Sequence, residues 1–310
     1  MTTQTERIEH VTPVSSPRSI RPTLLTTEFH AQNTGAPYWH LDLVPQSRLI
    51  GAEVRGIDLA DEPAPEVLAE LKRALLEWKV LFFRGQQLTA RQHAGLARQW
   101  GELEDHPFLP KAEIPEVVRL EHDASRPGTE NIWHSDVSFS PTPPMGSMLR
   151  AVEVPELGGD TLWADMSAAY EGLSAQVRER IDGLTAIHEV PMMSDKAEGE
   201  VAENMRAARA RLQPVEHPVV RTHPETGQKL LYVNAVFTTA IVGFTEKESQ
   251  ELLDLLFRQA THPEFQVRFH WEPGSIAFWD NRGTQHYAVS DYYPDLRRME
   301  RVTVIGDRPY

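Results

Sequence analysis

Many short apolar segments, each bounded by Pro, Gly or Asp, constrain the fold of this 310-residue chain more than any other feature of its sequence. Segments of this length between turn-forming residues are typical of β-strands. Only a few helical patterns lie between them, which favours a closed or double-sheet β architecture over a doubly wound α/β fold. The predicted strands comprise residues 146–154, 160–164, 217–222, 229–234, 265–271, 275–279 and 300–306.

Four helices are predicted among the strands, and three of them begin at residues that can cap a helix. Thr89 and Thr245 each precede a Gln or Glu by three residues, which is the capping-box pattern, and Asp165 can cap a third helix. A buried strand over residues 80–83 follows the fourth helix, residues 65–79. That helix is predicted from one apolar stripe: Leu68, Leu71, Leu75 and Trp78.

The composition excludes several classes of protein. The chain has no cysteine, so any protein metal ligand must be nitrogen or oxygen. A formal net charge of −14 argues against a nucleic-acid partner, and an anionic substrate would need locally placed arginines. No apolar run is long enough to span a membrane and the amino terminus lacks an apolar h-region, which predicts a cytoplasmic protein. No Gly-x-Gly-x-x-Gly or Walker motif supports a nucleotide cofactor.

The chain divides into an arm and one domain. Residues 1–45 are rich in Thr, Ser, Pro and Gln without a sustained period, so we predict a flexible or loosely docked amino-terminal arm. Residues 46–310 are predicted to form a single domain. Within it, residues 191–213 are polar and rich in alanine, and we interpret them as a candidate helical lid.

His134 and Asp136 are candidate metal ligands. On a strand, residues i and i+2 face the same side, so the imidazole and the carboxylate could reach one ion. A second histidine would complete a 2-His-1-carboxylate facial triad, which leaves coordination positions open for substrate and oxygen. The pair alone is weak, because 13 histidines and 45 acids give roughly two His-x-(Asp/Glu) pairs by chance. This chain has five, and the others begin at His40, His223, His262 and His270.

The carboxy-terminal block singles out the pair at position 134. His286 follows the run Trp279-Asp280-Asn281-Arg282, and Arg297 and Arg301 lie beyond it. A histidine followed by arginines on a neighbouring strand is what binding a dicarboxylate beside a metal requires, because a guanidinium matches a carboxylate in geometry. A solvated basic edge is the alternative interpretation of these arginines.

These segments resemble the taurine dioxygenase (TauD/TfdA) family over roughly residues 46–310. The likeness rests on several ordered segments and not on one motif: residues 80–86, 133–137, 158–163, 217–224, 279–286 and 297–307. The resemblance implies a mainly β fold with surrounding helices, the double-stranded β-helix or jelly-roll that cupins share. It also implies an Fe(II)- and 2-oxoglutarate-dependent dioxygenase that consumes O2.

The resemblance assigns roles to individual residues. It gives iron to His134, Asp136 and His286, and the distal carboxylate of 2-oxoglutarate to Thr161 and Arg297. The residues that it assigns to an anionic substrate are His106, Arg301, the backbone N–H of Val137, Phe237 in the pocket wall, and Glu130, which stands where taurine-cleaving members carry an asparagine.

The substrate that the resemblance implies is a small anion. It is taurine or a related alkylsulfonate, hydroxylated at the carbon that bears sulfur, with release of sulfite, an aldehyde, succinate and CO2. Alkyl sulfates, aryloxyalkanoates and other carboxylates are the alternatives within the same chemistry. A cupin-like binding protein without turnover is the alternative from another class. Relatives form dimers or tetramers, so a homo-oligomer is also expected.

Overall fold

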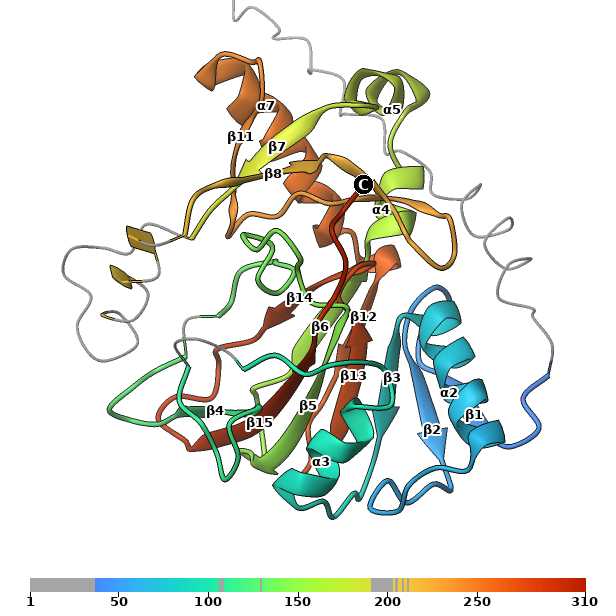
Figure 1. Ribbon diagram of the computed structural model, residues 1–310. Coiled ribbons are helices and arrows are strands. Elements are labelled where there is room, and N and C mark those ends of the chain that lie inside the picture. The colour runs from blue at the N-terminus through green and yellow to red at the C-terminus, as the bar shows by residue number, and fades with distance from the viewer. Residues whose placement is uncertain are drawn as a thin grey trace, which may run out of the picture.

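The computed structural model describes residues 37–105, 109–128, 130–190 and 212–310, together with residues 203, 206, 207, 209 and 210. Most of the described residues belong to β-strands and connecting loops, with helices around them (Figure 1). The elements, in chain order, are β1 (Asp42–Pro45), β2 (Ala52–Arg55), α2 (Pro65–Trp78), β3 (Val80–Phe83), α3 (Ala90–Ala97), β4 (Val117–His122), β5 (Gly146–Glu153), β6 (Thr161–Asp165), α4 (Met166–Glu171), α5 (Ala175–Ile181), β7 (Thr185–His188), β8 (Val215–Pro218), β9 (Val220–Thr222), β10 (Lys229–Leu231), β11 (Thr238–Ile241), α7 (Glu246–Phe257), η2 (Arg258–Thr261), η3 (Pro263–Phe265), β12 (Gln266–Phe269), β13 (Ile276–Asp280), β14 (Thr284–Ala288) and β15 (Arg297–Val304).

A seven-stranded sheet forms the frame of the molecule, in the order β1-β2-β3-β13-β5-β15-β4. All its pairings are antiparallel except that of β2 with β3. Its central strands are buried on both faces: in β3, Leu81 and Phe83 join one apolar cluster, whereas Val80 and Phe82 join another. This is why residues 80–83 form a continuous apolar run and show no alternation of apolar and polar residues.

A second sheet, β12-β6-β14, packs its apolar side chains against the large sheet. Phe82 of the large sheet stacks on Phe269 of β12, with ring centroids 4.2 Å apart, and meets the edge of Trp163 on β6. Two mainly antiparallel layers with a shared aromatic core make the double-sheet architecture that the strand pattern predicted, and it is the jelly-roll that the family resemblance implied. The prediction of a mainly β fold is therefore confirmed.

The helices cover the outside of this β structure. Helices α2 and α3 bury their apolar faces, including Leu71, Leu75 and Leu96, against the outer face of the large sheet. Helices α4 and α7 belong to a separate apolar cluster with β7, β10 and β11, at the opposite end of the molecule from α3 (Figure 1). The capping boxes predicted at Thr89 and Thr245 are both present, and Asp165 caps α4.

The predicted boundary between the arm and the domain differs from the structure. The boundary was placed after residue 45, but β1 pairs with β2 before that point, and the backbone N–H groups of Trp39 and His40 donate to the carboxylate of Glu70 on α2. A four-residue edge strand has too short a pattern to be distinguished from coil by its sequence. Residues 1–36 of the predicted arm lie outside the described residues.

For the candidate lid and for membrane-spanning segments, the structure gives information on the described residues only. Most of the candidate lid, residues 191–213, lies outside the described residues, and the described positions 203, 206, 207, 209 and 210 are helical. Among the described helices, none combines the length and the apolar character that crossing a membrane requires.

Candidate metal centre

Two backbone hydrogen bonds bring the two halves of the candidate metal centre together. The N–H of His286, on β14, donates to the carbonyl of His134 at 2.8 Å, and the N–H of His134 donates to the carbonyl of His286 at 3.1 Å. The two residues form an isolated antiparallel bridge, so both imidazoles start from neighbouring points, with ring centroids 4.2 Å apart. Sheet pairing thus fixes the distance between the two histidines before any side chain is considered.

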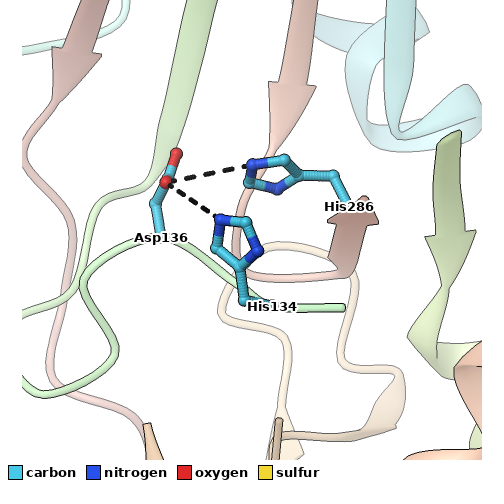
Figure 2. Close-up of side chains that lie close together, drawn as sticks. All are labelled: His134, Asp136 and His286. Carbon is cyan, nitrogen blue, oxygen red and sulfur yellow. Dashed lines mark ion pairs between the residues drawn. The ribbon is translucent and has the colours of Figure 1, made fainter. Parts of the chain in front are cut away.

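The carboxylate of Asp136 completes the cluster (Figure 2). Its Oδ1 lies 3.9 Å from Nε2 of His134 and 4.0 Å from Nε2 of His286. Ligand atoms that each lie about 2.1 Å from one ion are separated by about 3–4 Å, which matches this spacing. Among the described residues, this is the one group of three or more His and acidic side chains that could hold a metal ion.

Asp136 reaches the site from a turn and not from a regular strand, which corrects the local prediction. Residues 136–139 form a turn, and Val137 adopts a φ of +51°. This conformation strains a β-branched residue and persists only when its surroundings impose it. Asn281 imposes it here: its Oδ1 accepts from the Asp136 N–H at 2.7 Å, and its Nδ2 donates to the Asp136 carbonyl at 3.0 Å.

Neighbouring polar groups hold the ligand side chains in the forms that a cation needs. Nδ1 of His134 lies 2.8 Å from the carbonyl of Ile132, which places a proton on Nδ1 and leaves the lone pair of Nε2 free. Ser147 donates to Oδ2 of Asp136 at 3.1 Å, and Arg301 donates through Nη1 to Oδ1 at 2.9 Å.

The charges of the cluster suit metal binding. Burial raises the pKa of Asp136, but the charges of Arg301 and the two imidazoles lower it further, so its pKa lies well below the ordinary value. Burial, assisted by His134, lowers the pKa of His286 to about 3. At neutral pH the site therefore holds a carboxylate and a neutral imidazole at these two positions, the protonation states that ligate a divalent ion. The donor set fits Fe(II), because imidazole and carboxylate in a 2:1 ratio form the facial triad of non-haem iron oxygenases.

Arg297 and Thr161 come from different sheets. Arg297 begins β15 of the large sheet, and Thr161 begins β6 of the second sheet. The Arg297 side chain is buried, and its Nε and Nη2 have no hydrogen-bond partner within the described part of the chain. It passes close to Gly159: a Cβ built there would lie 3.2 Å from Nε of Arg297, and the φ of +68° also favours glycine. Thr161 follows two residues later, 2 % exposed. A buried guanidinium with two nitrogens that have no hydrogen-bond acceptor in this part of the chain suits an anionic ligand.

The residues predicted to contact substrate divide into three groups. Three of these residues lie beside the metal cluster: Arg301, Val137 and Phe237. Arg301 donates to Asp136, and Val137 is the next residue in the chain after Asp136. The Phe237 ring packs edge-on to the His134 ring, with centroids 6.2 Å apart. Oε1 of Glu130 lies 3.2 Å from Nε2 of His122. His106 lies outside the described residues.

Two of the other His-x-(Asp/Glu) pairs have structural partners of their own. Nε2 of His223 lies 3.0 Å from Oδ2 of Asp280, and Nδ1 of His270 lies 2.8 Å from Oδ1 of Asp160. In each case the histidine is paired with an acid remote in the sequence and not with the acid two residues on.

Several residues of the site have no role that could be predicted from the sequence. Asn281 and Asp280 were noted only as part of a motif, and Ser147, Trp271 and Tyr292 were not noted at all. Trp271 donates to the hydroxyl of Thr161, and Tyr292 lies under Arg297. Their side chains have no distinctive spacing, so only their contacts identify them.

Asp280 anchors the turn that leads into β14, and its replacement by asparagine is expected to destabilise the protein by about 3–5 kcal/mol. Arg282 donates to both of its carboxylate oxygens, and His223 lies against Oδ2. Burial raises the pKa of Asp280, but Arg282 and His223 lower it further, so its pKa lies well below the ordinary value. The carboxylate therefore stabilises the fold above its unfolded pKa of about 4, and this contribution is lost as the pH falls.

Urea unfolding of the Asp280→Asn variant at several pH values checks this. The difference in unfolding free energy from the parent should be full at pH 7 and should shrink below about pH 4. Asp182→Asn is the matched control, because the ion pair of Asp182 with Lys229 is exposed and should contribute less than about 1 kcal/mol. A difference that does not depend on pH would contradict this account.

Comparison with known proteins identifies the chain. A family model described as "Taurine catabolism dioxygenase TauD, TfdA family" matches residues 40–303. An alkylsulfatase of Acinetobacter baylyi is 38% identical over 277 residues, which cover 87% of each protein. An alpha-ketoglutarate-dependent sulfate ester dioxygenase of Pseudomonas putida is 37% identical over 275 residues, covering 87% of this chain and 91% of the relative.

Solved structures agree with this result. A crystal structure of a taurine dioxygenase from Burkholderia xenovorans superposes with a TM-score of 0.75 at 40% identity, covering 88% of this chain and 93% of that one. The jelly-roll fold and the cluster of two imidazoles and a carboxylate define the class: the chain is a 2-oxoglutarate-dependent dioxygenase that uses Fe(II), 2-oxoglutarate and O2. It belongs to the TauD/TfdA family. The alternative of a cupin-like protein without turnover is thereby set aside.

Proposed function

We propose that this dioxygenase hydroxylates a small organic molecule at a carbon that carries a sulfur oxyanion. His134, Asp136 and His286 would hold Fe(II), and Arg297 and Thr161 would hold the distal carboxylate of 2-oxoglutarate. The observation that carries the proposal is Arg301: its guanidinium is buried and donates to Asp136, and its Nε has no partner among the described residues. A cation in this position can hold an oxyanion beside the metal.

Bound Fe(II) supplies the oxidising chemistry, in which O2 converts 2-oxoglutarate to succinate and CO2 and one oxygen atom enters a C–H bond of the substrate. The protein itself orients the substrate and excludes water from the site. Arg301 would orient the substrate anion, with the backbone N–H of Val137 and, as predicted from the resemblance, His106. Phe237 and Phe139, whose rings meet at 5.2 Å, form an apolar wall next to His134 that excludes water.

Two substrate classes fit a sulfur oxyanion, and they differ in the bond that breaks after hydroxylation. Hydroxylation of the carbon that bears a sulfonate, as in taurine, leads to an aldehyde and sulfite. Hydroxylation of the carbon that bears the ester oxygen of an alkyl sulfate leads to an aldehyde and sulfate. Two observations favour the sulfate ester as a second candidate. The alkylsulfatase and the sulfate ester dioxygenase are both similar over most of this chain. Glu130, which stands where taurine-cleaving members carry an asparagine, lies against His122.

A product panel tests the proposal. Purified enzyme with Fe(II), 2-oxoglutarate and O2 is incubated with taurine, a longer alkylsulfonate, an alkyl sulfate and an aryloxyacetate, and succinate, sulfite and sulfate are measured. We expect succinate together with sulfite or sulfate in equal amounts. Succinate formed only with the aryloxyacetate, or with another carboxylate, would contradict a sulfur oxyanion and would favour the carboxylate alternative.

Arg301→Gln should reduce turnover of the accepted substrate by about 100-fold or more, because a charge-assisted contact of 1.5–3 kcal/mol is lost and a buried anion is left unpaired. Arg298→Gln is the matched control on the same strand, because Arg298 forms its ion pairs with Glu121 and Glu153 away from the metal cluster. Binding of 2-oxoglutarate in the absence of O2 should stay within a few-fold in both variants. Equal losses in the two variants would contradict a role of Arg301 in substrate binding.

The proposal also includes an oligomeric state and a cellular location. A homo-oligomer, dimer or tetramer, is expected from the family resemblance, and light scattering of the purified protein measures it. The cytoplasm is the proposed location, which fractionation of cells that express the protein would test.

A further inference from the structure

The hydroxyl of Thr161 has one hydrogen-bond partner in the described part of the chain, and this partner is a donor. Nε1 of Trp271 donates to Oγ1 of Thr161 at 3.0 Å, and both side chains are 2 % exposed. A threonine hydroxyl has one proton to donate and two lone pairs to accept with. Since Trp271 occupies a lone pair, the proton of the hydroxyl is free for an acceptor elsewhere.

The segments that carry the two residues are tied together at a second point, so the contact is not a chance approach of two side chains. Phe269 of β12 is paired with Thr161 of β6 in the sheet. The preceding residue, Asp160, accepts from Nε of Arg268 at 2.6 Å and contacts Nδ1 of His270 at 2.8 Å. These contacts hold residues 160–161 and 268–271 in one register, and the indole N–H is thereby directed at Oγ1.

Packing alone does not require this hydrogen bond. Trp78, Trp100, Trp163 and Trp279 each have a buried indole N–H that lacks a partner within the described residues. Trp163 lies in the same aromatic cluster as Trp271, with ring centroids 6.3 Å apart. The protein therefore accepts unpaired indole N–H groups in this core, and the pairing at Trp271 calls for a separate reason.

We propose that Trp271 is a positioning residue for the co-substrate: by donating to Thr161, it turns the threonine hydroxyl into an obligatory donor to the distal carboxylate of 2-oxoglutarate. This inference rests on the proposed function, in which Thr161 and Arg297 hold that carboxylate. Arg297 supplies the charge, and Thr161 supplies a directed neutral donor. Without the indole, the hydroxyl could rotate and would donate to the carboxylate for only part of the time. The selectivity for a dicarboxylic 2-oxo acid would then fall.

The test compares two ligands of the same length. The affinities of the Fe(II)-loaded enzyme for 2-oxoglutarate and for 2-oxopentanoate, which has a methyl group in place of the distal carboxylate, are measured by calorimetry without O2. In Trp271→Phe, we expect 2-oxoglutarate to bind about 3- to 10-fold more weakly, the effect of one neutral hydrogen bond. Binding of 2-oxopentanoate should stay within twofold. Trp163→Phe is the matched control, and it should leave the ratio of the two affinities unchanged.

Thr161→Val separates the inference from the proposed function. If Thr161→Val leaves 2-oxoglutarate binding unchanged, the assignment of Thr161 to the co-substrate is wrong and the proposed function fails at this residue. If Thr161→Val weakens 2-oxoglutarate binding but Trp271→Phe does not, or if Trp271→Phe weakens both ligands equally, the inference alone is overturned. In the double variant, Trp271→Phe should add nothing to the loss caused by Thr161→Val.

A second pair of variants covers the case in which Trp271→Phe does not fold. Trp271→His keeps an aromatic ring with an N–H donor, and Trp271→Leu keeps only apolar bulk. The histidine variant should retain more of the preference for 2-oxoglutarate over 2-oxopentanoate than the leucine variant. Equal preferences in these two variants would overturn the inference.

Discussion

Replacement of His286 by alanine is expected to weaken Fe(II) binding by more than about 100-fold and to abolish turnover, since loss of a ligand should exceed the 10- to 100-fold effect of an outer-sphere partner. The backbone of His286 forms the bridge to His134, and alanine keeps both of these hydrogen bonds. The fold should therefore persist while one of the imidazole donors is removed. Asp136 and His134 alone would form an incomplete site.

Two measurements without O2 check this expectation. Metal titration gives the Fe(II) affinity, and the visible absorption that Fe(II) and 2-oxoglutarate produce together should appear in the parent and be absent in the variant. Addition of metal should also raise the unfolding temperature of the parent, because a ligand that binds only the folded state stabilises it. In the His286→Ala variant, addition of metal should not raise the unfolding temperature.

His262→Ala is the matched control for His286→Ala. His262 also begins a His-x-Glu pair, but it is exposed and lies between η2 and η3, apart from the metal cluster. Its replacement should leave the Fe(II) affinity and turnover unchanged. Fe(II) affinity within a few-fold of the parent in His286→Ala would contradict the assignment of the ligands.

Replacement of Arg297 by methionine is expected to have two effects of opposite sign. The affinity for 2-oxoglutarate should fall by at least about 100-fold, because two charge-assisted hydrogen bonds of 1.5–3 kcal/mol each are lost. In the absence of co-substrate, the unfolding temperature of the Arg297→Met variant should be higher than that of the parent. The reason is that burial disfavours the charged guanidinium and lowers the pKa of Arg297, while Nε and Nη2 have no partner in the described part of the chain.

Calorimetry of 2-oxoglutarate binding and thermal unfolding with and without the co-substrate measure both effects. In the parent, 2-oxoglutarate should raise the unfolding temperature, and in Arg297→Met this rise should disappear. Arg298→Met is the control: the neighbouring Arg298 pairs with Glu121 and Glu153, so its loss should not change the affinity for 2-oxoglutarate. A variant Arg297→Met that is strongly destabilised but binds 2-oxoglutarate normally would show that Arg297 has a structural role only.

Local patterns in the sequence predicted the elements that depend on neighbouring residues. The capping box at Thr245 needs only Glu248 three residues later, and it forms as predicted. The run Val80–Phe83 is apolar throughout and forms the buried strand β3. By contrast, the predicted strand over residues 217–222 is divided at Val219 into β8 and β9, which belong to different sheets. No local pattern distinguishes one strand from two short ones that change partners.

The candidate site shows the same division. The sequence pattern and the family resemblance singled out His134, Asp136 and His286, and the structure brings them together. The expected alternation along a strand was wrong as the local reason, because Asp136 lies in a turn in which Val137 has a positive φ. The geometry depends instead on Asn281, which is 145 residues away from Asp136. The contacts of Glu130 with His122 and of Trp271 with Thr161 likewise join residues that no local pattern connects.

Residue types and their order already define the chemistry that is available to this protein: nitrogen and oxygen ligands without cysteine, Arg297 and Arg301 after the last histidine, and strands and capped helices in a fixed order. These follow from residue types and short spacings, which act within a few residues. The packed fold alone shows which imidazole meets which carboxylate, which arginine nitrogens are buried without a hydrogen-bond acceptor among the described residues, and which indole donates to Thr161. Backbone pairing joins His134 to His286, and side-chain contacts such as that of Asn281 with Asp136 fix the rest. Both join residues more than a hundred positions apart, and the backbone bonds can be formed by every residue type except proline as donor, so no local pattern reveals them.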